Sequence, residues 1–233
     1  MVPPVAGEEQ KNVPDAKRFS VDRSAGLAGQ YQVACNPEEN VLFVSGSYNH
    51  TKTHGTLCAT IARINADTLQ IEKTATLPVI PENNPELANF FQVQAAYGLA
   101  ADNERGLLWT GGTRTNSVTA YSQKDLSRVW DSLALGVEML TPRELYVAPN
   151  GAVLVTGMGG YQVISAPNAE GERKVSALQG ESPAMLLGPV ADETRSLLYI
   201  PNIMRDEIWV VDMNTWELTR KLPVIGGEDA NTP

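Results

Sequence analysis

The sequence predicts an all-β fold, a β-propeller of four-stranded antiparallel blades, and two observations support this. The first is a pattern that occurs four times: a short run of residues, a turn rich in Asn, Asp and Pro, and an apolar strand ending in small residues. The second is its spacing, because Phe43, Trp109, Leu154 and Tyr199 hold the same position in the four copies, at intervals of 66, 45 and 45 residues. A period of about 40–50 residues with four strands per unit is typical of propellers.

Each repeat supplies the first two strands of a blade, and the residues that follow it supply the other two. The repeats are 31–46, 97–112, 143–157 and 187–202. The expected third and fourth strands are 57–64 with 69–73, 117–121 with 126–130, 161–165 with 173–175, and 207–212 with 216–220. These segments alternate apolar and polar residues and are separated by Asp, Asn and Gly turns, which is the pattern of antiparallel hairpins.

The repeats divide the chain into an arm, four blades and a tail. The expected ranges are residues 1–30 for the arm, 31–76, 95–140, 141–182 and 183–222 for the blades, and 223–233 for the start of a further connection. Two insertions, residues 47–56 and 76–94, account for the long first interval, and the second could hold one helical turn beginning at Pro85.

A single blade cannot bury both of its faces, so neighbouring blades must stack face to face. The four equivalent residues Phe43, Trp109, Leu154 and Tyr199 are therefore expected in the cores between blades. Charged residues such as Lys73, Arg128 and Glu217 recur in the fourth strands, as expected for the solvated rim of a propeller.

Composition limits the possible functions. The formal charge of −9 and the lack of a Lys/Arg cluster argue against nucleic-acid binding. Apolar runs are too short to span a bilayer, and residues 1–5 lack the basic and apolar regions of a signal peptide. Cys35 and Cys58 are the only cysteines. They fall near opposite ends of strands that are not neighbours, so we expect two free, mostly buried thiols.

Several phrases resemble the YncE-like, YVTN-repeat β-propellers of bacteria. They are Leu42-Phe-Val-Ser-Gly, Leu108-Trp-Thr-Gly-Gly, Thr141-Pro-Arg-Glu-Leu, and Leu198-Tyr-Ile-Pro-Asn followed by Ile208-Trp-Val-Val-Asp-Met-Asn-Thr. The resemblance implies a seven-bladed propeller in the periplasm or secreted, without an established enzymatic activity. Four blades would then be an incomplete propeller, completed by missing blades or a second chain. A compact ring of four blades is the alternative.

Candidate ligand-binding residues lie in the connections between strands two and three and between strand four and the next blade. Both connections emerge on the same face of a propeller, around its channel. The candidates are Tyr48, His50, Tyr97, Arg114, Asn116, Arg143 and Arg205. Arg143 and its neighbour Glu144 also suit a structural ion pair or a bond between blades. His50 and His54 alone cannot complete a metal site, so we expect no metal, no cofactor and no catalytic residue.

Three functions stay open at this point. The first is a non-enzymatic exported propeller that binds a small ligand or a protein partner on its loop-rich face. The second is a propeller enzyme, lactonase-like or quinoprotein-like, with a metal or cofactor in the channel, which would need convergent carboxylates and histidines. The third is binding of single-stranded nucleic acid through aromatic and basic residues, which the net charge opposes.

Overall fold

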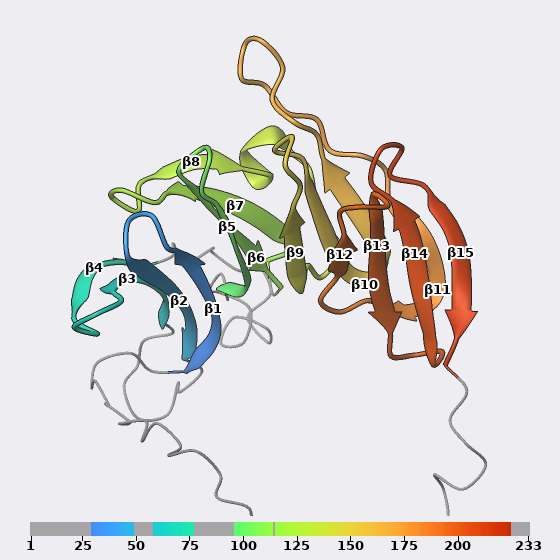
Figure 1. Ribbon diagram of the computed structural model, residues 1–233, viewed down its shortest axis with the longest axis horizontal. Coiled ribbons are helices and arrows are strands. Elements are labelled where there is room, and N and C mark those ends of the chain that lie inside the picture. The colour runs from blue at the N-terminus through green and yellow to red at the C-terminus, as the bar shows by residue number, and fades with distance from the viewer. Residues whose placement is uncertain (1–28, 49–57, 77–95, 114, 225–233) are drawn as a thin grey trace, which may run out of the picture.

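The computed structural model describes residues 29–48, 58–76, 96–113 and 115–224. They form four antiparallel sheets that follow one another along an arc, with the first and the fourth at its two ends (Figure 1). The predicted all-β propeller architecture is confirmed. The sheets described do not close into a ring, so the compact four-bladed alternative is not what the chain adopts.

The first, second and fourth sheets each have four strands in chain order. The first contains β1 (Gln30–Asn36), β2 (Val41–Tyr48), β3 (Cys58–Asn65) and β4 (Ile71–Thr76). The second contains β5 (Ala96–Asp102), β6 (Leu107–Gly112), β7 (Ser117–Ser122) and β8 (Arg128–Asp131), followed by the 3-10 helix η1 (Leu133–Leu135). The fourth contains β12 (Val190–Asp192), β13 (Leu197–Asn202), β14 (Glu207–Asp212) and β15 (Leu218–Pro223).

The turn between the third and fourth strands has the same construction in these three sheets. Its last residue is Leu69, Leu126 or Trp216, each with a left-handed φ between 54° and 61°. The backbone N–H of that residue donates to the carbonyl four positions earlier, over 2.7–2.9 Å. This turn places a large apolar side chain at the same point of each of these sheets.

The third sheet departs from the prediction of two separate strands over residues 153–157 and 161–165. It contains β9 (Glu144–Val147), β10 (Val153–Ile164) and β11 (Gln179–Met185) in the order β11-β10-β9. Arg173 Nη1 donates both to Gly151 O, at 2.6 Å, and to Ser165 O, at 2.9 Å. The two ends of β10 therefore lie together, and this long strand folds back on itself.

Glycines make this irregular sheet possible, and β11 itself was not predicted. A Cβ on Gly160 would lie 2.0 Å from Gln179 O, and one on Gly180 would lie 2.1 Å from Gly159 O. Only glycine allows the two backbones to approach this closely. The predicted fourth strand at residues 173–175 is reduced to a single bridge between Ile164 and Val175.

Apolar cores fill the spaces between successive sheets. Phe43, Trp109 and Leu154 are all 0% exposed, as predicted. Tyr199 is only partly buried because it lies on the face of the fourth sheet opposite to Leu198 and Ile200, which pack against the third sheet. The prediction of a buried residue was wrong at this one position, where no further described sheet covers the face.

Cys35 also differs from the prediction, because it is free but exposed. Its neighbour Ala34 packs against the core between the first two sheets, so alternation along β1 turns Cys35 to the other face. The side chain of Cys58 lies outside the described part. No helix among the described residues is long and apolar enough to span a membrane.

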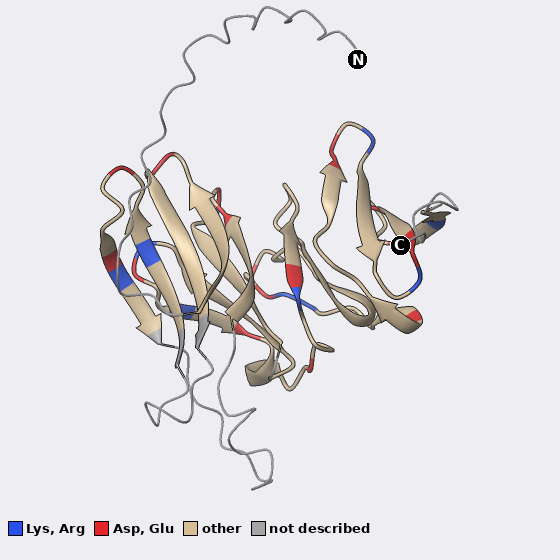
Figure 2. Ribbon diagram, turned by 90° about the horizontal axis from the view of Figure 1, so that it is seen from below, with Lys and Arg blue, Asp and Glu red and all other residues tan. Residues whose placement is uncertain are grey.

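Charges of both signs are distributed over the described strands and turns, and many acidic residues lie in the turns (Figure 2). Two of the turns between the first and second strands of a sheet each contain an equivalent Asp–Arg ion pair. Arg105 Nη1 lies 3.2 Å from Asp102 Oδ1, and Arg195 Nη1 lies 2.6 Å from Asp192 Oδ2. The two turns thus carry the same ion pair, in which the arginine follows the aspartate by three residues.

Candidate functional site at the ends of the inner strands

The innermost strands of the first three sheets, β1, β5 and β9, lie side by side along the inner side of the arc. Gly98 on β5 permits their close approach. A Cβ at this position would lie 2.3 Å from Arg143 O and 2.6 Å from Leu145 Cδ1. The chain segment just before β9 is therefore held directly against β5.

The guanidinium of Arg143 lies against two tyrosines that come from different sheets. Its Nη2 donates a hydrogen bond of 2.9 Å to the hydroxyl of Tyr31. Its guanidinium carbon lies 5.9 Å from the centre of the Tyr31 ring and 5.8 Å from that of Tyr97. The two rings are themselves in contact, with centres 4.5 Å apart and planes at 59°. Aromatic rings at these distances attract a cation through their negative faces.

Within the described part of the chain, most of the side-chain donors of Arg143 have no protein acceptor. A guanidinium carries five N–H donors. Among the described residues only Tyr31 accepts from Arg143, and Nε is buried without a partner. Such a group can still form the two parallel hydrogen bonds that a carboxylate or phosphate accepts from arginine.

Gln32 and Glu144 lie beside this arginine and connect three sheets. Gln32 Nε2 donates to Glu144 Oε2 over 2.8 Å, and Gln32 Oε1 accepts from the backbone N–H of Leu99 over 2.6 Å. Burial raises the pKa of the Glu144 carboxyl, while the hydrogen bond from Gln32 and the charge of Arg143 oppose that rise. We call Tyr31, Gln32, Tyr97, Arg143 and Glu144 the mouth cluster.

Of the predicted site residues, Tyr97 and Arg143 come together in this cluster. His50 and Arg114 lie outside the described residues, as does the side chain of Tyr48. The segment around Pro85, where one helical turn was expected, lies outside as well. The ligand-binding role of the candidates stays a prediction.

Asn116 and Arg205 are occupied by contacts elsewhere. Asn116 Oδ1 accepts from the backbone N–H of Thr141 at 3.0 Å, which fixes the segment leading to β9. Arg205 Nε donates to Pro183 O at 3.1 Å, and its Nη1 forms an ion pair of 3.1 Å with Glu181. Asn116 thus fixes a connection between sheets, whereas Arg205 joins the fourth sheet to β11 of the third.

Tyr31, Gln32 and Glu144 were not among the predicted site residues. The repeat itself contained the information, because Tyr31, Tyr97 and Arg143 each begin a copy and Gln32 and Glu144 each hold the second position. Equivalent positions on neighbouring inner strands lie at the same end of a propeller. The predicted interpretation of Arg143 and Glu144 as a bond between blades fits their contacts with Tyr31 and Gln32 of the first sheet.

No cluster of three or more His, Cys, Asp or Glu that could hold a metal ion is found within the described residues. Both histidines belong to the segment 49–57, which the structure does not describe.

No family model matches the sequence, and no curated protein matches it either. Solved structures do match by fold. Hydrazine synthase of Kuenenia stuttgartiensis has a TM-score of 0.60 at 12% identity, over 89% of this chain and 52% of that one. The Cps50 (Swd1) β-propeller domain of Myceliophteria thermophila has a TM-score of 0.60 at 10% identity, over 89% and 59%.

A third match is dihydro-heme d1 dehydrogenase NirN in complex with DHE, with a TM-score of 0.57 at 12% identity, over 85% of this chain and 38% of that one. The chain therefore spans between about two fifths and three fifths of the structures it resembles. Identities this low support the propeller fold alone. Membership of the YncE-like group stays a prediction.

Proposed function

We propose that this protein is a non-enzymatic β-propeller that binds a small anionic ligand, one that presents a carboxylate or a phosphate, at the mouth cluster. The observation that carries the proposal is Arg143, held against Tyr31 and Tyr97, with one protein acceptor for its five donors among the described residues. A guanidinium fixed on aromatic rings loses little freedom on binding, and its planar edge matches an anion.

The neighbouring Gln32 and Glu144 support the same role by fixing the inner strands. Their hydrogen bond and that from Leu99 to Gln32 tie β9 and β5 to β1. A site built on rigid strands holds its donors at constant positions.

The test is calorimetric titration of the protein at low ionic strength with inorganic phosphate and with succinate. Saturable 1:1 binding of either ligand is expected. Arg143→Gln should weaken it by about tenfold or more, since a hydrogen bond to a charged group contributes roughly 1.5–3 kcal/mol. Arg220→Gln removes an exposed arginine on β15 and is the matched control, with unchanged affinity. Equal affinity of the two variants would overturn the proposal.

A third titrant, an oligothymidylate, tests the alternative of single-stranded nucleic acid, because the paired tyrosines and Arg143 could also stack bases. The proposal requires that the small anions bind and that the oligonucleotide does not bind more tightly. Tight, strongly salt-dependent binding of the oligonucleotide would replace the proposal with that alternative.

Export to the periplasm or secretion belongs to the same proposal and is supported by the resemblance to YncE-like proteins. Immunodetection in periplasmic, secreted and cytoplasmic fractions of the natural host tests it. The enzyme alternative is kept because two of the structural matches are named as enzymes. Turnover of a bound ligand, followed by mass spectrometry, would favour the enzyme.

A further inference from the structure

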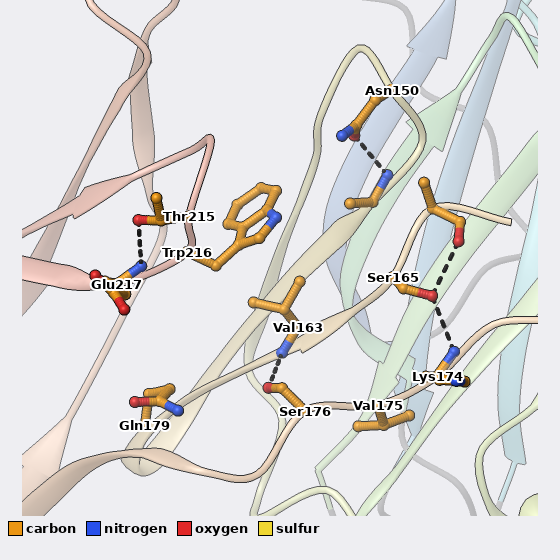
Figure 3. A pocket seen from close by; sticks show the side chains of 12 residues that line it. Asn150, Val163, Ser165, Lys174, Val175, Ser176, Gln179, Thr215, Trp216 and Glu217 are labelled. Atoms are coloured by element: carbon orange, nitrogen blue, oxygen red, sulfur yellow. Dashed lines mark hydrogen bonds between the residues drawn. The ribbon is translucent and has the colours of Figure 1, made fainter. Parts of the chain in front are cut away.

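A hollow lies between the outer parts of the third and fourth sheets, away from the residues of the mouth cluster. Its volume is about 490 Å³. That size falls within the usual range for pockets that enclose small molecules. Trp216, Val163 and Val175 give it apolar walls, and Lys174, Gln179 and Glu217 add polar groups (Figure 3).

The comparison with Leu126 shows why a hollow exists here. Leu126 and Trp216 end equivalent turns, with φ of 57° and 61° and the same backbone hydrogen bond. Leu126 is 5% exposed and fills the core between the first and second sheets. Trp216 also packs against a core, the one between the third and fourth sheets, but it is only partly buried and lines an open space. The outer part of the third sheet, reduced to one bridge at Val175, does not supply the packing that Leu126 receives.

The position of Trp216 is fixed from behind by Tyr161. The Tyr161 hydroxyl donates to Trp216 O over 2.9 Å, and its ring packs edge-on against Trp209 with centres 6.5 Å apart. Tyr161 is 1% exposed. The indole of Trp216 is thus attached to a rigid backbone, which gives a preformed aromatic wall.

Some polar groups of the hollow are hydrogen-bonded within the protein, and others can bind a ligand. The hydroxyls of Ser165 and Ser176 accept from the backbone N–H groups of Lys174 and Val163, both at 2.9 Å. Within the described part of the chain, the side chains of Lys174, Gln179 and Glu217 make no hydrogen bond or ion pair. Figure 3 places Lys174 on the side of Ser165, and Glu217 on the opposite side beside Thr215.

We propose that this hollow binds a short zwitterionic peptide with an aromatic side chain. The aromatic ring stacks on Trp216, the terminal carboxylate pairs with Lys174, and the terminal ammonium pairs with Glu217. Opposite charges on two sides of a pocket complement a ligand whose own charges are separated, as they are in a di- or tripeptide. The backbone of the peptide finds Gln179 as donor and acceptor. This inference does not rest on the function proposed for the mouth cluster.

Titration of the full chain with the tripeptide Gly-Phe-Gly, followed by calorimetry, tests the inference. Saturable 1:1 binding is expected. N-acetyl-phenylalanine, which lacks the ammonium, and phenylalanine amide, which lacks the carboxylate, should each bind at least about threefold more weakly, since an exposed ion pair contributes little individually. Absence of binding, or equal binding of all three compounds, would refute the peptide site.

Three variants identify the location. Trp216→Leu introduces the residue already present at Leu69 and Leu126, so folding should be retained while affinity falls by about tenfold through loss of ring stacking. Lys174→Gln should weaken the tripeptide and leave phenylalanine amide unaffected. Lys73→Gln, on β4 of the first sheet, is the matched control. Wild-type affinity of Trp216→Leu, with an unchanged circular dichroism spectrum and melting temperature, would overturn the assignment to this hollow.

Discussion

Gln32 on β1 and Glu144 on β9 are joined by a hydrogen bond of 2.8 Å, although they stand 112 residues apart in the sequence. The strand between them, β5, is bonded to the same glutamine through the N–H of Leu99. One side chain of the first sheet therefore connects three successive sheets. This connection orders the mouth cluster. It also means that protonation of Glu144 should change the free energy of unfolding.

Replacing Glu144 by Gln should change how stability depends on pH. Burial raises the pKa of Glu144 above its ordinary value of 4.5, so the folded state holds this proton more tightly than the unfolded state. In the wild-type protein the protonated carboxyl therefore contributes its full stabilisation to the folded state below about pH 4.5. This stabilisation is lost as the pH rises through the higher pKa that Glu144 has in the folded state.

Glu144→Gln stays neutral, so its free energy of unfolding should increase relative to wild type as pH rises above about 4.5. Urea unfolding at several pH values between 4 and 7 measures this difference. A difference between Glu144→Gln and wild type that shrinks with rising pH would contradict the expected sign.

Gly98→Ala should separate β5 from β9. Its new methyl group would lie 2.3 Å from Arg143 O, and backbone must move to accommodate it. We expect a loss of about 1–3 kcal/mol in the free energy of unfolding and a displaced Arg143 with weaker anion binding. Gly188→Ala is the matched control, because its nearest contact would be Glu144 Cγ at 3.9 Å. Equal stability and equal anion affinity of both variants would rule out the close approach.

Asn36 and Gln123 should be energetically coupled across the first and second sheets. Asn36 Nδ2 donates to Gln123 Oε1 over 2.8 Å, and the two residues are 3% and 1% exposed. Each alanine substitution leaves a buried polar partner, which should cost about 1–3 kcal/mol. A double-mutant cycle by urea unfolding should give a coupling energy of about 0.5–1.5 kcal/mol. Strict additivity would show that the bond contributes nothing to the interface.

The repeat pattern predicted most of the fold because each blade is coded locally. Turn residues and alternation located the hairpins, and their common register predicted the burial of Phe43, Trp109 and Leu154. Tyr199 was mispredicted because burial there depends on a neighbouring sheet, which local sequence does not specify. The predicted burial of Cys35 was wrong for a related reason. Alternation along β1 places it on the face opposite to that of Ala34, away from the second sheet.

The third sheet and the full mouth cluster required three-dimensional information. β11 has no apolar alternation, and five of its seven residues are exposed, so nothing in its sequence indicated a strand. It forms because Gly160 and Gly180 let two backbones meet. Likewise, the pairing of Gln32 with Glu144 depends on how far three inner strands are rotated against one another, which the residue order alone does not determine.

Tyr161→Phe should destabilise the protein and Tyr146→Phe should not, although both remove one hydroxyl near the same core. The Tyr161 hydroxyl donates to Trp216 O, so its loss should lower the free energy of unfolding by about 0.5–1.5 kcal/mol. The Tyr146 hydroxyl is buried and has no hydrogen-bond partner among the described residues, so its removal should be neutral or stabilising. Burial, with a smaller effect of the Glu217 charge, raises the pKa of Tyr161 to about 12. In an absorbance titration at alkaline pH, Tyr161→Phe should therefore show one tyrosine fewer among those that ionise at the highest pH. Equal destabilisation by the two variants would show that the bond to Trp216 does not hold the wall of the hollow.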